Sequence, residues 1–424
     1  MSNKINIIVV TIPLPYTGGG YRALLSIKEY KKRGINPFIV LPWGLSSPFT
    51  AEEMKFLFRE GLCIYGRTML PRILQIHFPF RRSLASFLIS RGFPIVKIAI
   101  NGENFRNFHC VMSMHECIDA MTTCLKIGEL FSLKMIAFLQ LPPFYGERQR
   151  LKNIEEARHL WLEAVEDFEK RLSWGLIREA EHSILKSVKR LLSHFDLILA
   201  VSRSIPIEMG EEWLRRVISL DPGVALSQED VHLINSVLKE VRKKEEIIIF
   251  GGRASPDKGI IEALIAFKKI KRDIGRNYKL VITGRISNET LKKIRSFCDK
   301  IKIKDNVLFY GFVPRKERLA LVAKSKSMLY PSHVDAFPYA VLESLYLNTP
   351  VVAYDIPALR TYYNCLEGVS LVKELDIEAL AQKVVETIER RNTSVERPKF
   401  TKSWDKIMDE ETNLIKGFIK NISQ

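Results

Sequence analysis

The sequence predicts an α/β protein with two doubly wound parallel-sheet domains in tandem. Short apolar runs alternate with amphipathic stretches of helical length along almost the whole chain, which is the rhythm of βαβ units. The turn Asp221-Pro222-Gly223 and the charged stretch Lys239–Glu246 interrupt this rhythm near the middle. The length of 424 residues also fits two domains.

The predicted strands follow the apolar runs. In the first half of the chain they are Ile5–Thr11, Pro37–Leu41, Val96–Ile100, Cys110–Ser113, Met135–Leu139 and Leu197–Val201. In the second half they are Ile247–Phe250, Lys279–Thr283, Val307–Tyr310, Ser327–Tyr330 and Val351–Ala353. Each run in the second half leads into a stretch with helical periodicity, as at Ile260–Ile270 and Leu291–Ile301, so parallel strands with helical crossovers are expected.

Two stretches depart from the strand–helix rhythm. Residues Glu147–His194 are helical in pattern almost throughout, and we expect helices that pack on the first sheet. Residues Arg67–Arg106 carry basic and aromatic side chains against one acid, Glu103. That composition is typical of a helix that binds a membrane surface, and it is equally compatible with a solvated basic face.

The composition excludes several classes of protein. Hydrophobic residues make up 46% of the chain and charged residues 27%, unlike a disordered, collagenous or polytopic membrane protein. Lys and Arg outnumber Asp and Glu by 65 to 48, and the net charge of +17 favours an anionic partner: a phosphorylated molecule, an acidic membrane or nucleic acid. No signal peptide or spanning helix is apparent, and the six cysteines form no C-x-x-C pair, so we expect a cytoplasmic protein.

A cluster of potential metal ligands is formed by His109, Cys110, His115 and Cys117. Their spacing matches no structural zinc pattern, and alternation along a strand would point them to opposite faces. We therefore expect no metal site in this segment.

Two glycine turns follow predicted strands. Gly18-Gly19-Gly20 precedes a helix that opens near Tyr21, where either a tight turn or a ligand close to the backbone would require glycine. Gly251-Gly252-Arg253 follows another strand, and Lys258-Gly259 opens the next helix. Backbone amides, a guanidinium and an ammonium at this spacing suit a diphosphate, although a solvated loop with two surface cations would have the same pattern.

The segment Pro331–Glu343 contains two carboxylates that the fold could bring to one site. Asp335 lies in the loop after a predicted strand, and Glu343 lies in the helix that follows. Both can face the carboxyl end of the sheet, where open α/β folds bind their ligands. In the alternative interpretation, Asp335 only caps the helix and Glu343 is a surface acid.

Taken in order, these motifs resemble those of the retaining glycosyltransferases of family 4 (glycosyl transferases group 1). Gly252-Arg253-x4-Lys258-Gly259 resembles the diphosphate motif of that family, and Asn306-Val307-x-Phe309-x-Gly311-Phe312 resembles its base-binding turn. Asp335-x7-Glu343, followed by Thr349-Pro350-Val351-Val352, resembles its E-x7-E signature. The first half matches more loosely, through Gly18-Gly19, Arg33-Gly34, His115 and Asp196-x5-Ser202.

The chain departs from the family pattern in three places. Asp335 stands where the family usually has Glu, which bears on contact with the donor sugar. Asn348 replaces the usual Gly before Thr-Pro, and Asn tolerates left-handed backbone. Asp355-Ile356-Pro357-Ala358 lacks the Gly-Gly and Glu that often follow, which bears on donor selectivity.

The resemblance implies a GT-B architecture of two facing Rossmann-like domains. Residues 1–222 would form the acceptor-side domain and residues 223–400 the nucleotide-sugar-binding domain. Residues 401–424 would form a helix that packs back on the first domain. Apolar side chains at helical spacing agree with a packing helix there; they are Trp404, Ile407, Leu414, Ile415 and Phe418.

The resemblance also implies roles for the matching residues. Arg253 and Lys258 would hold the donor diphosphate, Asp335 would face the transferred sugar, and His115 would line the sugar and acceptor site; these are the candidate catalytic residues. The candidate donor-binding residues are Gly18, Gly19, Gly252, Gly311, Phe312, Val313, Phe337, Pro338, Tyr339 and Glu343, the last towards the ribose hydroxyls. No D-x-D motif is present, so we expect no metal and no cofactor, with the cations serving the leaving group instead.

We therefore interpret the chain as a retaining, metal-independent hexosyltransferase that moves a sugar from a UDP- or GDP-linked donor to a lipid-linked glycan or glycolipid precursor. The stretch Arg67–Arg106 would contact an anionic membrane on its cytoplasmic face. One alternative is a nucleotide-sugar epimerase or hydrolase of the same fold. The other is a basic nucleic-acid-binding protein, against which the spread of basic residues and the lack of an RNP-like aromatic set both weigh.

Overall fold

The chain folds into two compact units. The computed structural model describes residues 5–14, 18–42, 50–69, 88, 91, 97–100, 107–166, 174–275, 277–390, 394–400 and 402–422. Unit 1 comprises Met1–Gly146, Trp174–Val224 and Lys402–Gln424. Unit 2 comprises Glu147–Ser173 and Ala225–Thr401.

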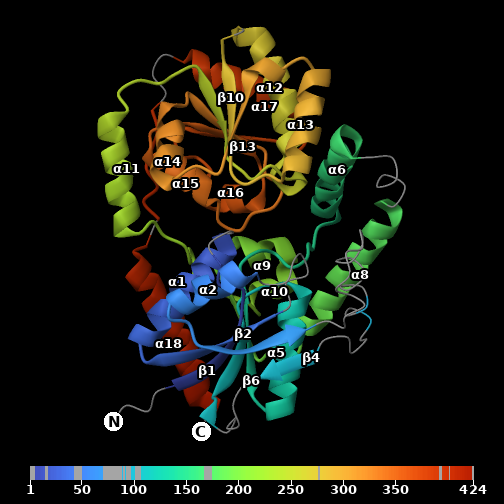
Figure 1. Cartoon of the computed structure of the whole chain (residues 1–424), viewed down its shortest axis with the longest axis vertical. Helices are drawn as coiled ribbons and strands as arrows, with labels where there is room; N and C mark the ends of the chain where they lie inside the picture. The colour runs from blue at the N-terminus through green and yellow to red at the C-terminus, as the bar shows by residue number, and fades with distance from the viewer. Residues whose placement is uncertain are drawn as a thin grey trace. The chain divides into compact units, whose positions relative to one another are not determined.

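Unit 1 is built on an eight-stranded sheet with the order β4-β3-β2-β1-β5-β6-β7-β8. Figure 1 labels β1, β2, β4 and β6 of this sheet. The strands are β1 (Ile5–Val10), β2 (Ile35–Leu41), β3 (Ile64–Met69), β4 (Lys97–Ile100), β5 (Cys110–Ser113), β6 (Lys134–Leu139), β7 (Leu197–Ala200) and β8 (Ile218–Ser219). Neighbouring strands are parallel except for the antiparallel pair β3 and β4. The strand order reverses between β1 and β5, so the loops after these two strands meet at the carboxyl edge of the sheet.

The last helix of the chain belongs to unit 1, as the GT-B architecture implies. The helices of this unit are α1 (Gly18–Lys32), α2 (Ala51–Arg59), α5 (Ile118–Phe131), α8 (Trp174–Leu192), α9 (Ser204–Met209), α10 (Glu211–Leu214) and α18 (Trp404–Ile422). Helix α18 lies against α1 (Figure 1). Its buried Glu411 lies 2.6 Å from the guanidinium of Arg22 and accepts a hydrogen bond from the hydroxyl of Tyr30. A buried carboxylate needs such partners, so these contacts fix α18 on unit 1.

Unit 2 contains a six-stranded, fully parallel sheet with the order β11-β10-β9-β12-β13-β14. Figure 1 labels β10 and β13 of this sheet. The strands are β9 (Ile247–Phe250), β10 (Lys279–Thr283), β11 (Val307–Gly311), β12 (Ser327–Tyr330), β13 (Val351–Tyr354) and β14 (Val369–Val372). This is the Rossmann strand order, and it reverses between β9 and β12. Both units therefore have the predicted doubly wound α/β fold.

One helix from the first half of the chain packs in unit 2. The helices of this unit are α6 (Arg148–Val165), α11 (Gln228–Glu240), η2 (Pro256–Lys258), α12 (Ile260–Ile274), α13 (Asn288–Lys300), η3 (Lys304–Asn306), α14 (Arg315–Lys324), α15 (Tyr339–Tyr346), α16 (Pro357–Tyr363) and α17 (Ile377–Glu389). Helix α6 contacts η2, α12 and α13 (Figure 1). The expectation that all helices of Glu147–His194 pack on the first sheet is therefore wrong for α6, because its buried Arg150 pairs with Glu374 of unit 2.

Burial explains which strands the sequence predicted. Strands such as β5, β12 and β13 are buried along their whole length and consist of apolar runs. Strand β3 carries Gly66 and Arg67 and so forms no apolar run, and β14 is only half-buried at the edge of its sheet; the sequence pattern predicts neither. The end of α15 agrees with expectation, since Asn348 has a left-handed φ of 55°.

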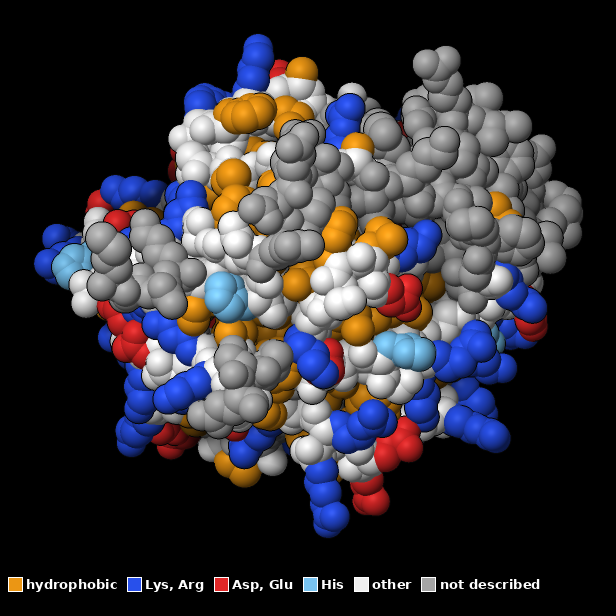
Figure 2. Space-filling view, turned by 90° about the horizontal axis from the view of Figure 1, so that it is seen from below, with side chains coloured by type: hydrophobic (Ala, Val, Ile, Leu, Met, Phe, Trp, Pro, Cys, Tyr) orange, Lys and Arg blue, Asp and Glu red, His pale blue; other side chains and the backbone are white. Residues whose placement is uncertain are grey.

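The basic stretch Arg67–Arg106 lies mostly outside the described residues. Of its basic side chains, those of Arg67 and Arg91 are described, and both are exposed. Within the described part of the chain, no helix combines the length and apolar character needed to cross a membrane. On the face shown in Figure 2, Lys and Arg side chains are dispersed among acidic and apolar ones and form no single patch among the residues that are coloured.

Candidate functional site

Two loops of unit 2 meet at the carboxyl edge of its sheet. One follows β9 and contains Gly252 and Arg253, and the other follows β12 and contains Asp335. Because β9 and β12 are neighbours at the point where the strand order reverses, both loops flank the same crevice. A Cβ on Gly259 would lie 2.0 Å from the carbonyl oxygen of Pro331, so the start of α12 touches the second loop and only glycine fits.

Lys258 and Asp335 form an ion pair in this crevice, with Nζ 3.0 Å from Oδ2. The Lys258 ammonium also donates to the carbonyl oxygen of Val334. Asp335 accepts further hydrogen bonds from the hydroxyl of Tyr330 and from the backbone N–H of Ala336. Burial and the neighbouring carboxylate raise the pKa of Tyr330 well above its ordinary value, so its hydroxyl stays protonated as a donor. Three donors therefore converge on Asp335.

Arg253 differs from Lys258 because it is largely unengaged. Its side chain is 61% exposed, and its guanidinium lies 3.5 Å from the carboxylate of Asp257. An exposed ion pair of this kind is weak, so the guanidinium keeps its capacity to bind an anion. Gly252 lies beside Lys258: a Cβ there would come within 2.9 Å of the lysine Cβ, so glycine lets the two cations share one turn.

Glu343 lies in α15 beneath two arginines from the start of α14. Its side chain is 1% exposed; the guanidinium of Arg315 lies 2.9 Å from Oε1 and that of Arg318 lies 2.8 Å from Oε2. Asp230 of α11 also pairs with Arg315, at 2.6 Å, and accepts a hydrogen bond from the hydroxyl of Tyr339. Burial opposes the charge on Arg315, but the two carboxylates outweigh it and raise the pKa of that guanidinium. Glu343 is thus a buried, paired carboxylate and not a surface acid.

The turn after β11 is open and aromatic. Gly311 has a φ of 66°, which favours glycine, and a Cβ there would meet nothing within 4 Å. Phe312 is 71% exposed, and the guanidinium of Arg285 lies 5.3 Å from its ring centre. Val313, which follows, is half-buried. This turn leaves backbone and one aromatic face available to a ligand.

The side chain of Phe337 and the backbone carbonyl of Pro338 both make packing contacts. The Phe337 ring is buried at 5.0 Å from that of Tyr362 and also contacts Phe400. The carbonyl oxygen of Pro338, the residue before α15, accepts a hydrogen bond from the hydroxyl of Tyr363. These contacts hold the segment that connects Asp335 to Glu343.

The strand order of unit 1 also reverses, between β1 and β5, and open α/β sheets form a crevice at the carboxyl edge of such a point. Helix α1 begins at Gly18, where a Cβ would meet nothing within 4 Å. The carbonyl oxygen of Gly19 accepts a hydrogen bond from the Gln140 amide, 3.1 Å away, and that amide also donates to the carbonyl oxygen of Met114. Gln140 therefore ties the glycine turn to the end of β5. The open Gly18 leaves room at the start of a helix, where unpaired N–H groups attract polar or anionic ligands.

His115 follows β5 in this crevice. Its Nε2 accepts the backbone N–H of Ile12 at 3.2 Å and lies 3.1 Å from the hydroxyl of Thr11. Burial lowers the pKa of His115 to about 4, so the ring is neutral near pH 7. The neighbouring Glu116 accepts the backbone N–H of Gln140, and burial raises the pKa of its carboxyl.

The structure thus gathers the predicted residues into two groups, one on each sheet. His115, Gly18 and Gly19 lie in unit 1, and the remaining candidates lie in unit 2. Sequence reasoning missed several side chains that complete the groups: Tyr330, Arg315, Arg318, Asp230, Glu116 and Gln140. The basic run at the start of α14 was a signal for the two arginines, but the others carry no motif. Among the described residues, no group of three or more His, Cys, Asp or Glu side chains is arranged to hold a metal ion.

Comparison with known families finds a match over most of the second half of the chain. Residues 236–404 match the family described as glycosyl transferases group 1. The O-antigen chain mannosyltransferase RfbU of Salmonella typhimurium is 28% identical over 170 residues, 39% of this chain and 46% of the relative. An α-1,4-N-acetyl-D-galactosaminyltransferase of Campylobacter jejuni, whose name gives an undecaprenol-linked glycan, is 24% identical over 194 residues, 40% of this chain and 50% of the relative. The chain spans about half the length of these curated relatives.

Solved structures confirm the GT-B fold. Sucrose-phosphate synthase from Thermosynechococcus elongatus matches with a TM-score of 0.60 and 14% identity, over 98% of this chain and 100% of that one. HepE from Anabaena, solved in complex with UDP, matches with a TM-score of 0.61 and 10% identity, over 97% of this chain and 100% of that one. Identities this low establish the fold alone.

Proposed function

We propose that the chain, whose residues 236–404 match the group 1 glycosyl transferases, is a glycosyltransferase that uses a nucleoside diphosphate sugar. The observation that carries the proposal is the crevice between β9 and β12, within the matched region. It combines two cations, Arg253 and Lys258, with a carboxylate, Asp335, at the ligand-binding edge of a Rossmann sheet. The two cations can form charge-assisted hydrogen bonds to a diphosphate, and the carboxylate can accept hydrogen bonds from sugar hydroxyls.

The two cations would act on the leaving nucleotide. As the bond between the sugar and the diphosphate breaks, negative charge grows on the phosphate oxygens, and preorganised positive charge stabilises it. Arg253 offers a bidentate fork, and Lys258 offers a point charge that Asp335 holds in place. No metal is included in the proposal, because these side chains supply the charge.

The remaining residues of unit 2 would orient the donor. Asp335 and the backbone of Phe337–Tyr339 would face the transferred sugar, and the open turn Gly311–Val313 would receive the base through its backbone. Glu343 would accept hydrogen bonds from the ribose hydroxyls while it remains ion-paired with Arg315 and Arg318. UDP and GDP are both candidates; HepE, with the same fold, was solved with UDP.

Unit 1 would bind the acceptor and the transferred sugar. His115 is neutral at pH 7, so its ring can exchange hydrogen bonds with sugar hydroxyls without introducing a charge. We propose a hexose donor, retention of anomeric configuration and a lipid-linked glycan acceptor. The names of the relatives, which include an O-antigen chain and an undecaprenol-linked glycan, support the acceptor class. Contact of Arg67–Arg106 with the cytoplasmic face of an anionic membrane is part of the same proposal.

A panel of UDP- and GDP-sugars tests the proposal. A ligand at 100 times its Kd raises the free energy of unfolding by about 2.7 kcal/mol, which a thermal shift detects. The stabilising donor is then incubated with and without undecaprenol-linked glycans, and the products are analysed. Transfer to an acceptor is expected, with EDTA leaving the rate unchanged. Sugar release or epimerisation with donor alone, and no transfer, would favour the hydrolase or epimerase alternative. No shift with any donor would contradict the proposal.

A further inference from the structure

His333 lies fully buried two residues before Asp335, between two carboxylates. Its Nε2 is 2.7 Å from Oε1 of Glu262 in α12, and its Nδ1 is 2.7 Å from Oε1 of Glu374, which follows β14. Both ring nitrogens donate at once only when the imidazole is protonated. Burial opposes that charge, but the hydrogen bonds that the ring donates to the two carboxylates outweigh it and raise the pKa of His333.

Arg150 of α6 completes this cluster. Its side chain is 8% exposed; one guanidinium nitrogen lies 2.5 Å from Oε2 of Glu374, and another donates to the backbone carbonyl of His333 at 2.6 Å. Two carboxylates thus face one guanidinium and one imidazole ring whose pKa is raised. Removing one member would leave an uncompensated charge, so the four side chains act as a unit.

The cluster also joins the two loops of the crevice. The backbone N–H of His333 donates to the carbonyl oxygen of Asp257, 3.0 Å away, in the loop that carries Arg253 and Lys258. Lys258 in turn donates to the carbonyl of Val334. The backbone of residue 333 is therefore fixed on one side by the diphosphate loop and on the other by Arg150.

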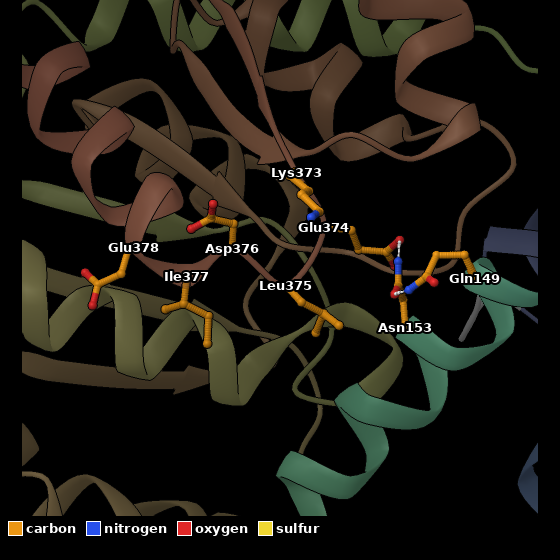
Figure 3. Close-up of a pocket in the computed structure, with 8 residues that line it drawn as sticks. All are labelled: Gln149, Asn153, Lys373, Glu374, Leu375, Asp376, Ile377 and Glu378. Carbon is orange, nitrogen blue, oxygen red and sulfur yellow. Dashed lines mark hydrogen bonds between the residues drawn. The ribbon is translucent and has the colours of Figure 1, made fainter.

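Side chains next to Arg150 connect α6 to the segment that follows β14. A pocket of about 550 Å³ lies beside α6, lined by Gln149 and Asn153 of α6 and by Lys373–Glu378 (Figure 3). Asn153 joins the two sides: it accepts from Gln149 at 2.8 Å and donates to Glu374 at 2.6 Å (Figure 3). The bond to Glu374 holds α6 against the segment after β14, next to the contact of Arg150 with the same carboxylate.

We propose that Arg150 and His333, with Glu262 and Glu374, are positioning residues that hold the loop of Asp335 in register with the diphosphate loop. The inference rests on the proposed function for its effect on turnover. None of the four needs to touch the donor, because each acts through the backbone of residues 333–335. A displacement of about 1 Å at reacting groups costs up to about 100-fold in rate, so the cluster should govern kcat.

Arg150→Met is the principal test, because methionine keeps the apolar stem and loses both donated contacts. We expect kcat for sugar transfer to fall by about 10- to 100-fold. The Kd for UDP or GDP, whichever the donor carries, should stay within about threefold, because Arg253 and the turn at Gly311 are outside the cluster. Hydrogen exchange of residues 331–338 should accelerate. Arg148→Met, an exposed arginine on the same helix, is the matched control and should match wild type in all three measurements.

Glu374→Gln keeps the size of the side chain and provides a second test if Arg150→Met does not fold. It should lower kcat less than Arg150→Met, with the same unchanged Kd. Values of kcat within twofold of wild type in both folded variants would overturn the inference, as would a Kd that weakens in parallel with kcat. A wild-type protein that no nucleotide sugar stabilises would instead refute the proposed function. Exchange of residues 331–338 still decides the positioning role in that case, since equal exchange in Arg150→Met and wild type contradicts it.

Discussion

The carboxyl edges of the two sheets have the same topology and opposite chemistry. In each unit the strand order reverses beside a glycine turn. A histidine follows the second strand at each reversal: His115 follows β5 in unit 1, and His333 follows β12 in unit 2. His333 of unit 2 is clamped between carboxylates that favour its charged form, whereas burial holds His115 of unit 1 neutral. Around them, unit 2 gathers ion pairs such as Lys258–Asp335, and unit 1 gathers the uncharged amide of Gln140.

This difference teaches which unit suits which ligand. A shared fold supplies the crevice, and the local charges select its occupant. The edge of unit 2, with its two cations, can neutralise a diphosphate. The edge of unit 1, where an amide and a neutral imidazole lie beside the carboxyl group of Glu116, can exchange hydrogen bonds with a hydroxyl-rich sugar. Each substitution below changes one edge and leaves the other as a reference.

Lys258→Ala should have the largest effect. Loss of one preorganised charge at the leaving group costs about 10²–10³ in kcat, or roughly 2.7–4 kcal/mol. The fold should change little, because Asp335 keeps its bonds from Tyr330 and Ala336. Steady-state kinetics and circular dichroism provide the measurement, with Lys268→Ala on the exposed face of α12 as control. A near-normal kcat would place the donor diphosphate elsewhere.

The contrast between these edges was only partly predictable from sequence. Glycines and cations close to one strand end, as at Gly252 and Lys258, form local motifs that a single sequence displays. The buried strands were equally visible because apolar runs mark them. Partners distant in the chain were not: Arg150 lies 183 positions from His333, and no pattern in α6 distinguishes packing on unit 2 from packing on unit 1. The position of α6 depends on ion pairs with residues far away in the chain, and such pairs leave no periodic pattern in the sequence.

The glycines should differ in tolerance between the units. Gly259→Ala combines a left-handed φ of 69° with a Cβ 2.0 Å from the Pro331 carbonyl oxygen, so we expect a loss of at least about 3 kcal/mol or failure to fold. Gly18→Ala meets no atom within 4 Å and should be neutral or slightly stabilising. Urea denaturation measures both variants. Equal losses would show that the unit 1 turn is as constrained as that of unit 2.

The two histidines should give opposite pH dependences of stability. His115 has a folded pKa of about 4 against an ordinary 6.5, so the unfolded chain binds the proton first and stability falls as pH drops from 6.5 to 4, by about 3 kcal/mol at most. The raised pKa of His333 works the other way: its contribution is complete below pH 6.5 and is lost as pH rises through the folded pKa.

Denaturation from pH 4 to 9 tests this, with hydrogen exchange reporting each unit. His115→Gln should flatten the acid side of the profile for unit 1, and His333→Gln should flatten the alkaline side for unit 2. Glu262, Glu374, Arg150 and Tyr354 all face His333, so its profile belongs to the cluster as a whole. Profiles that both variants leave unchanged would contradict the assignment of charge states.

His115→Ala should affect turnover more than donor binding. The residue lies in unit 1, whereas Arg253 and Lys258 lie in unit 2, so we expect kcat to fall about tenfold while the Kd for the nucleoside diphosphate stays within about twofold. Kinetics with saturating donor and calorimetry with UDP or GDP measure the two effects. An unchanged kcat would make His115 a packing residue whose hydrogen bonds to Thr11 and Ile12 serve the fold alone.

Glu116→Gln should have the smallest effect, and it distinguishes the edges most directly. Glu116 accepts the backbone N–H groups of Gln140 and Leu141, at 3.0 and 3.3 Å, and burial raises the pKa of its carboxyl. A glutamine oxygen can accept the same bonds without a buried charge, so the free energy of unfolding should change by less than about 1 kcal/mol. Glu116→Ala should cost more, about 1–3 kcal/mol, because two partly buried N–H groups lose their acceptor. Asp335→Asn is the matched change on the charged edge, where loss of the Lys258 ion pair should reduce kcat strongly. If Glu116→Gln instead impairs turnover as much as Asp335→Asn does, the edge of unit 1 also depends on a negative charge.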